Sequence, residues 1–231
     1  MWCDLSEKKV AVTNEIYAIV KEQIITMQLL PGQLLMVQHI SDENGISRTP
    51  VREALVRLRE ENLLEDADGR KFRVTQITWK MISDLYEARK AIELYAVAEV
   101  APVVTKTQIA ALKKLVSAME RCYERRDFQA SFEHDMAFHN KILEICGNQV
   151  IINWMNRMRD QQQRIRYLSV GSESRMAGSL AEHKAILDRL EQHDPEGAKN
   201  AMFQHLDRAL RDMLKLRDQG YFVSAQVIRD S

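Results

Sequence analysis

The sequence contains little proline, glycine and cysteine. Its 231 residues include 4 Pro and 8 Gly, which predicts long helices rather than many strands and turns. The cysteines Cys3, Cys122 and Cys146 are scattered and form no CxxC pair, which excludes a disulfide framework. This cysteine usage is typical of a protein that works in a reducing cytoplasm.

The sequence also lacks a long hydrophobic run. No stretch approaches the roughly 18 consecutive apolar residues of a membrane helix, so we expect no membrane partner. Residues 1–7 include no basic segment leading into an apolar run, so we expect no signal peptide. With 45% hydrophobic and 29% charged residues, the chain predicts a folded cytoplasmic protein with a buried core.

An excess of positive charge is missing as well. The net charge is zero, and residues 1–77 contain 10 Lys or Arg against 12 Asp or Glu. A basic surface is the first feature expected of a protein that binds nucleic acid. Any case for DNA binding therefore depends on where the few positive charges lie.

The first 77 residues predict three helices and a β-hairpin. Gly45 stands where the second helix needs a residue with positive φ, and Ser47 is a good N-cap for the third. Pro50 falls in the first turn of that third helix, where a missing N–H costs little. Residues 66–69, Asp-Ala-Asp-Gly, predict a hairpin turn. The expected elements are helices over 13–27 and 37–44, a third helix after Ser47, and strands over 63–65 and 72–76.

Positive and polar side chains gather at the start of the third helix. Arg48 and Arg52 are four residues apart and share one helix face, with Ser47 and Thr49 beside them. A guanidinium pairs with guanine or clamps a phosphate, and the free N–H groups of a helix start attract a phosphate. Together with Gly69 and Arg70 at the hairpin tip, this arrangement predicts a winged helix-turn-helix that binds double-stranded DNA. The alternative is a winged helix that serves only as a protein interface.

The string Gly45-Ile46-Ser47-Arg48-Thr49-Pro50-Val51-Arg52-Glu53-Ala54-Leu55 resembles the GntR family of bacterial regulators. The resemblance covers residues 12–76 and implies that Arg48, Thr49, Arg52 and Gly69 contact operator DNA. The chain departs from the family pattern at three positions: Gln38 stands where an Arg is common, Asn44 where a Leu is, and Asn62 where a Gly is usual. Gln38 still offers a contact to a phosphate or base edge.

The residues after Thr78 all predict helix. We therefore expect a mainly α protein, with a winged helix-turn-helix of three helices plus a β-hairpin followed by an all-α six-helix antiparallel bundle. The domain boundary is placed between residues 77 and 78. The expected helices cover about 79–100, 107–126, 128–146, 149–168, 175–193 and 196–217.

The helical half carries four candidate metal ligands. Asp135 and His139 are four residues apart on one helix face, His183 lies on a later helix, and His205 lies on the last long helix. An Asp with three His suits Zn, and also Ni, Fe or Mn. The alternative is a buried polar network that binds no metal. The helical run resembles the FCD ligand domain of the FadR-type branch of the GntR family, and this resemblance implies that the four residues hold a divalent metal ion.

Arg89 is the candidate for binding an effector. It matches an Arg of the FCD pattern that faces the ligand cavity, and the resemblance implies that it pairs with a small organic acid. Its alternative role is an ordinary surface salt bridge with Glu93, four residues further along the same helix.

These patterns predict a homodimeric transcription regulator whose affinity for operator DNA changes when a small carboxylate binds at the metal. Two alternatives stay open: a metal-dependent enzyme that uses the Asp and His residues, and a helical half that only dimerises the DNA-binding half. Because no general base or nucleophile stands at a motif position, we expect no catalytic residues and no enzyme activity.

Overall fold

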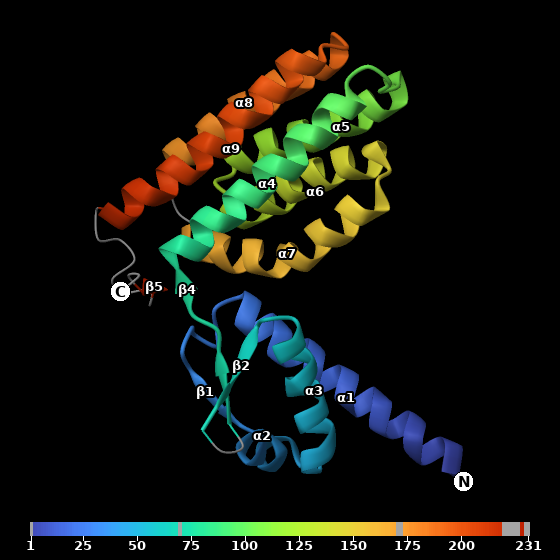
Figure 1. The fold of residues 1–231 in the computed structure, drawn as a ribbon, viewed down its shortest axis with the longest axis vertical. Helices are drawn as coiled ribbons and strands as arrows, with labels where there is room; N and C mark the ends of the chain where they lie inside the picture. Colours follow the sequence, from blue (N-terminus) through green and yellow to red (C-terminus); the bar gives the residue numbers. More distant parts are fainter. Residues whose placement is uncertain (1, 69–70, 170–172, 219–226, 229–231) are drawn as a thin grey trace. The chain divides into compact units, whose positions relative to one another are not determined.

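The structure is a computed structural model that describes residues 2–68, 71–169, 173–218 and 227–228 (Figure 1). Its described residues form two compact units. The first unit contains the chain up to Trp79, the segment Arg159–Leu168 and residues 227–228. The second contains the chain from Lys80 to Met158 and from Ser169 to residue 218.

The first unit is a winged helix-turn-helix, as predicted. Its elements are α1 (Trp2–Ile25), β1 (Leu34–Met36), α2 (Val37–Asn44), α3 (Arg48–Glu60), β2 (Leu64–Ala67) and β3 (Lys71–Val74). The strands form an antiparallel sheet in the order β1-β3-β2. The hairpin of β2 and β3 was predicted, whereas β1 was not. A third strand joins because the chain turns at Gly32, whose N–H donates to Val74 O, and Leu35 then pairs with Phe72.

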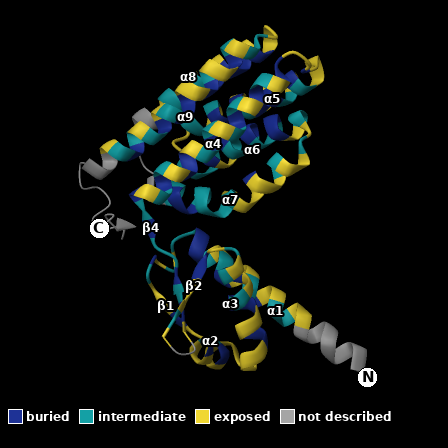
Figure 2. Cartoon of the chain, in the orientation of Figure 1, coloured by how far each residue is buried: buried dark blue, intermediate teal, exposed yellow. Residues whose placement is uncertain are grey.

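The core of the first unit lies between α1, α3 and the sheet (Figure 2). Val51, Leu55 and Leu58, spaced along α3, are completely buried. They pack against the apolar stripe of α1, in which Ile24 is also completely buried. Burial of side chains of this size stabilises the fold by about 1.5–3 kcal/mol each. This packing holds α3 so that its polar side remains at the surface.

Three turn positions agree with the sequence analysis, and one detail does not. Gly45 ends α2 at φ 62°, and Asn62 takes φ 59°, the left-handed conformation that asparagine tolerates. Ser47 is the N-cap of α3, but its hydroxyl makes no capping hydrogen bond. The expected side-chain cap is therefore wrong, and the hydroxyl is left exposed at the helix start.

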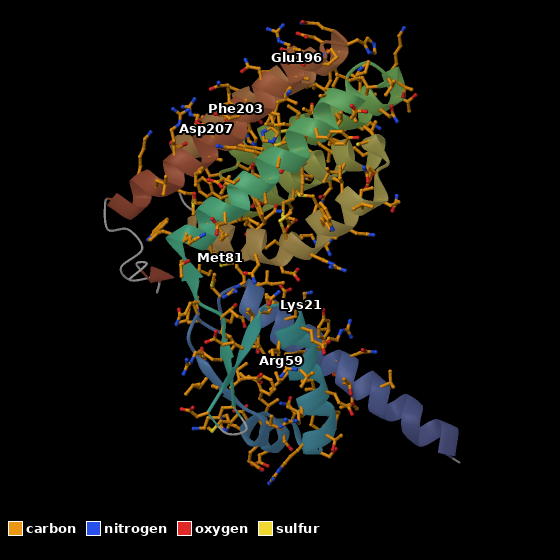
Figure 3. The ribbon with its side chains drawn as sticks, viewed as in Figure 1. Lys21, Arg59, Met81, Glu196, Phe203 and Asp207 are labelled. Atoms are coloured by element: carbon orange, nitrogen blue, oxygen red, sulfur yellow. The ribbon has the colours of Figure 1, made fainter. Side chains whose placement is uncertain are left out.

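Polar contacts also hold α3 within the first unit. Arg59, on α3, donates to Asp66 of β2 over 2.9 Å. Lys21, near the end of α1, contacts Glu61, which directly follows α3, over 2.8 Å (Figure 3). These ion pairs tie the C-terminal end of α3 to α1 and β2.

The second unit is built from long helices. They are α4 (Trp79–Val100), α5 (Lys106–Glu124), α6 (Phe128–Cys146), α7 (Gln149–Ser169), α8 (Glu173–Glu191) and α9 (Pro195–Asp218). Asp194 begins α9 as predicted, because its carboxylate accepts from the N–H of Gly197. α5 packs against α6 and α8, and α8 packs against α9. Within the unit, Lys90 of α4 contacts Asp207 of α9 over 2.8 Å, so α4 is tied to α9 as well.

The expectation that every element after Thr78 is helical is wrong in one place. The two-residue strand β4 (Ile77–Thr78) pairs in parallel with β5 (Val227–Ile228). Two residues are too few to carry a period-2 pattern, so the sequence offers no signal for this pairing. None of the helices formed by the described residues has the length and apolar content needed to cross a membrane.

Candidate DNA-reading face and metal centre

A hollow of about 940 Å³ lies on the polar side of α3. We call it the reading hollow. It is bounded by side chains of β1, α2, α3 and β3. Its lining residues are Met36, Val37, Gln38, Arg48, Thr49, Arg52, Glu53, Val56, Arg57, Glu60 and Lys71. The helix start and a wing strand therefore face one concave surface.

The reading hollow gathers most of the predicted DNA contacts. Gln38, Arg48, Thr49 and Arg52 all line it, and all are exposed. Ser47 lies next to them as the exposed N-cap. The two predicted contacts at the hairpin tip, Gly69 and Arg70, lie outside the described residues.

Three features of the reading hollow were not predicted. Arg57 is a further cation of the lining, and its guanidinium lies 3.8 Å from the centre of the Tyr17 ring, which fixes its direction. Two acids, Glu53 and Glu60, share the same lining. The side-chain amide of Gln38 donates to Asp42 over 2.5 Å and 2.6 Å, so it is held by its own helix rather than free. The face is thus mixed in charge, as the count along the sequence indicated.

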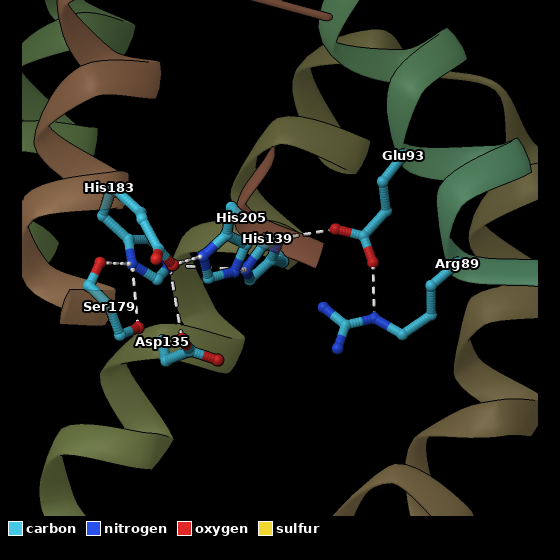
Figure 4. Close-up of polar contacts among 8 residues, drawn as sticks. Arg89, Glu93, Asp135, His139, Ser179, His183 and His205 are labelled. Carbon is cyan, nitrogen blue, oxygen red and sulfur yellow. Dashed lines mark hydrogen bonds and ion pairs between the residues drawn. The ribbon is translucent and has the colours of Figure 1, made fainter. Parts of the chain in front are cut away.

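In the second unit, the four candidate metal ligands come together in a buried cluster, which we call the Asp–His cluster (Figure 4). Asp135 and His139 lie on α6, His183 on α8 and His205 on α9. One ligand atom from each lies within 4.8 Å of the others. Each residue is at most 4% exposed, so the protein itself surrounds these polar groups.

The three imidazoles of the cluster turn the same nitrogen inward. The Nε2 atoms of His139 and His205 are 3.2 Å apart, and those of His183 and His139 are 3.3 Å apart. The Nε2 atom of His183 also lies 3.3 Å from an oxygen of Asp135. Two ligand atoms bound to one tetrahedral Zn at about 2.0–2.1 Å are themselves about 3.3–3.4 Å apart. These separations suit a shared divalent cation.

The outer nitrogen of each imidazole faces an acceptor. Nδ1 of His139 lies 2.5 Å from Glu93 Oε2, and Nδ1 of His205 lies 2.9 Å from Glu182 Oε2. Nδ1 of His183 lies 2.7 Å from the carbonyl of Ser179. With a proton on each Nδ1, on the side of these acceptors, a lone pair is left on each Nε2. Three lone pairs facing one another repel, and a cation among them removes the repulsion.

Arg89 is buried beside this cluster rather than on the surface. Its Nε donates to Glu93 Oε1 over 2.7 Å, and both side chains are less than 8% exposed. Glu93 therefore contacts both Arg89 and His139. The expected pair with Glu93 is present, but it is buried, so a surface salt bridge does not describe it.

The electrostatics of this pair are strong. Burial alone would raise the pKa of Glu93, but Arg89 and His139 lower it to about 2. Burial likewise opposes the charge on Arg89, but Glu93 raises the pKa of Arg89 above its ordinary value. Both groups stay charged at neutral pH. Asp135 also raises the pKa of Arg89, so the guanidinium lies within electrostatic reach of the Asp–His cluster.

Two acids of this site were not predicted as part of the metal centre. Glu93 was considered only as a partner of Arg89, and its spacing gave no link to His139 on another helix. Glu182 precedes His183 in the sequence but contacts His205 of α9 instead. Two other histidines lie elsewhere: His39 contacts Glu43, and Nδ1 of His193 donates to the carbonyl of Ala101 over 2.9 Å.

A winged helix-turn-helix joined to an all-helical unit defines a class, the helix-turn-helix transcription regulators. Comparison with known families makes the assignment specific. Residues 12–74 match the bacterial regulatory proteins of the gntR family, and residues 84–208 match the FCD domain. The chain therefore belongs to the GntR family and carries an FCD domain. It is a DNA-binding transcription regulator rather than an enzyme, which sets aside the metal-dependent enzyme considered above.

Individual relatives agree with this assignment. The HTH-type transcriptional repressor RspR of Escherichia coli strain K12 is 26% identical over 208 residues, covering 90% of this chain and 91% of the relative. The Exu regulon transcriptional regulator of the same strain is 30% identical over 213 residues, covering 84% and 81%. The solved structure of E. coli McbR/YncC superposes with a TM-score of 0.73 at 20% identity, covering 89% of this chain and 98% of that one. The last likeness is one of fold.

Proposed function

We propose that this regulator changes its affinity for operator DNA when a small carboxylate binds at a divalent metal ion in the FCD domain. The observation that carries the proposal is the inward orientation of three buried Nε2 atoms beside Asp135. Asp135, His139, His183 and His205 would hold the metal, with Zn as the first choice and Ni, Fe or Mn as alternatives. A bound metal supplies a positive charge and open coordination places for the effector.

Arg89 supports an anionic effector in this proposal. A planar guanidinium binds a carboxylate through two parallel hydrogen bonds. Its Nε is already used by Glu93, which leaves the terminal nitrogens for a ligand. Because Glu93 balances the charge of Arg89, most of the attraction for an anion would come from the metal.

Gln38, Ser47, Arg48, Thr49, Arg52, Gly69 and Arg70 are the proposed DNA contacts. Four of them, Gln38, Arg48, Thr49 and Arg52, line the reading hollow, and this shared position supports the proposal. A single winged helix-turn-helix with so few cations binds DNA weakly. We therefore propose a homodimer whose two winged helix-turn-helix units bind the two halves of a pseudo-palindromic operator. Such a protein acts where the DNA is, in the bacterial cytoplasm.

Metal analysis of the purified protein tests the metal centre. Wild-type protein should carry about one divalent ion per chain, and His183→Ala should lose it, because removing one inward Nε2 opens the cluster. His134→Ala is the matched control, since His134 lies on α6 next to Asp135 but outside the cluster. Equal metal content in the wild type and His183→Ala would contradict the proposed ligands.

Fluorescence anisotropy with the upstream region of its own gene tests the effector. Metal-loaded wild type should change its DNA affinity with small mono- or dicarboxylates. Arg89→Lys keeps the charge but loses the fork geometry, so it should keep its metal and respond less. Absence of any salt-sensitive, sequence-selective binding would overturn the proposal at its first step.

A further inference from the structure

Helix α7 is shared by the two units. Its first part, up to Met158, belongs to the second unit, and Arg159–Leu168 belongs to the first. In the second unit Met155 is buried in the core cluster. Met155 and Arg164 are nine residues apart on one uninterrupted helix, which is about 14 Å along its axis. The two positions therefore belong to one continuously hydrogen-bonded helix.

Three residues of the part of α7 in the first unit make polar contacts there. Asp160 contacts Lys21 of α1 over 2.7 Å. Gln161 Nε2 donates to the carbonyl of Asn62, at the turn after α3, over 2.9 Å. Arg164 donates from Nη1 to Thr75 Oγ1 over 2.7 Å and from Nη2 to Thr75 O over 2.6 Å. Thr75 directly follows the wing strand β3.

Arg164 is an unusual residue for such a contact. It is 0% exposed, its Nε has no hydrogen-bond partner among the described residues, and no carboxylate there pairs with it. Burial lowers the pKa of Arg164 to about 10, which still leaves it charged at neutral pH. A buried charge without a carboxylate is costly, so a side chain needed only to fill space would be neutral. What the charge provides is two directed hydrogen bonds to one residue.

Those hydrogen bonds are part of a network that joins Arg164 and Gln161 of α7 to Thr75 and to the turn after α3. Thr75 Oγ1 donates to the carbonyl of Asn62 over 3.0 Å, and that carbonyl also accepts from Gln161. Arg164 donates to the same hydroxyl. Thr75 leads back into β3, whose Lys71 lines the reading hollow opposite α3. The network therefore fixes the wing strand against the end of α3.

We propose that Arg164 is a positioning residue for DNA reading: through Thr75 it lets α7 set the place of the wing strand against α3. The proposal rests on the proposed function, because it supplies the route by which a ligand in the second unit reaches the reading hollow. Arg164 does not touch DNA in this scheme. Its loss changes how DNA affinity responds, not which bases are read.

Three variants of the full-length protein test this role. Arg164→Met keeps the length of the side chain and removes its charge and donors. Thr75→Val removes only the hydroxyl that Arg164 contacts, and it replaces Arg164→Met in the test if that variant folds poorly. Arg164→Lys restores the charge and one donor group. Arg159→Met is the matched control, because Arg159 is an exposed arginine on the same helix.

The first measurement needs no metal or effector. Met155→Ala loosens α7 in the second unit, and hydrogen exchange is followed in peptides covering residues 62–75. In the wild-type background this change should speed exchange there by about threefold or more, as for residues that share one network. In the Arg164→Met or Thr75→Val background the added effect should vanish. An equal effect in both backgrounds, or no effect in either, would overturn the proposal.

The second measurement uses Zn as the probe and the upstream DNA. The ratio of DNA affinities with and without Zn should differ from one in the wild type and in Arg159→Met. It should fall toward one in Arg164→Met at unchanged Zn content, with partial rescue in Arg164→Lys. An Arg164→Met ratio equal to the wild type overturns the coupling role and leaves the proposed function standing. If Zn alone does not alter wild-type affinity, the exchange measurement decides the role of Arg164, and the proposed function is decided by its carboxylate titration.

Discussion

The buried pair of Arg89 and Glu93 allows a quantitative prediction. Glu93→Gln removes the carboxylate charge at nearly constant size and leaves the guanidinium of Arg89 buried without its partner. Breaking a buried ion pair from one side costs about 3–5 kcal/mol. The lowered pKa of Glu93 gives a similar free-energy cost. A fall from 4.5 to about 2 corresponds to about 3 kcal/mol, at roughly 1.4 kcal/mol per unit of pKa.

The double variant Arg89→Met/Glu93→Gln separates the pair from its burial. It removes both charges, so the free energy of unfolding should recover most of what Glu93→Gln loses. Glu87→Gln is the control, because Glu87 is an exposed acid on the same helix, and it should stay within about 0.5 kcal/mol of wild type. Urea unfolding followed by far-UV circular dichroism, with metal chelated in every sample, measures all of these values.

The difference in free energy of unfolding between wild type and Glu93→Gln should depend on pH, because the pKa of Glu93 is lowered in the folded protein. A carboxylate whose folded pKa is lowered stabilises the protein fully above its unfolded pKa, and this contribution is lost as the pH falls through the folded pKa. The gap between wild type and Glu93→Gln should therefore stay constant from pH 7 to 5 and narrow only below about 4.5. A gap below about 1 kcal/mol at pH 7, or one that already narrows between pH 7 and 5, would refute the reasoning.

Three other predictions concern DNA, metal and assembly. Arg52→Ala should weaken specific DNA binding by about 1–3 kcal/mol in anisotropy titrations, whereas Arg59→Ala, whose partner is Asp66 of β2, should change it little. Metal at about one hundred times its Kd should stabilise the protein by about 2.7 kcal/mol, and a chelator should lower the Tm by roughly 5–11 °C in wild type but not in His183→Ala. Sedimentation should give twice the chain mass of 26.8 kDa, and residues 1–77 alone should bind the same DNA poorly.

The sequence predicted the winged helix-turn-helix well because its signals are local. The stripe of Val51, Leu55 and Leu58 repeats at helical spacing, and Gly45 marks a left-handed helix end within a few residues of it. The strand β1 was missed for the opposite reason. It has only three residues, and its partner β3 lies more than thirty residues further along the chain. No local pattern in the sequence reveals such a pairing.

The Asp–His cluster was predicted in its four members but not in its surroundings. Asp135 and His139 share a helix face by their spacing, His183 and His205 were candidates on two later helices, and the family resemblance implied that the four act together. The contacts of Glu93 with His139 and of Glu182 with His205 join different helices. Such contacts depend on how the helices pack, and no spacing within one helix encodes them.

The weak charge of the reading hollow makes the proposed role of the buried Arg164 physically reasonable. A strongly basic face would bind phosphates wherever the wing strand lay, since counterion release depends on charge and not on shape. The reading hollow instead mixes Arg48 and Arg52 with Glu53 and Glu60, so its attraction for DNA is small unless its few contacts are well placed. In the proposed dimer, a displaced wing strand would lower the binding free energy at both half-sites. A total loss of about 1.4 kcal/mol is already a tenfold change in affinity. A weakly charged face is therefore the kind that a displacement at Thr75 can switch.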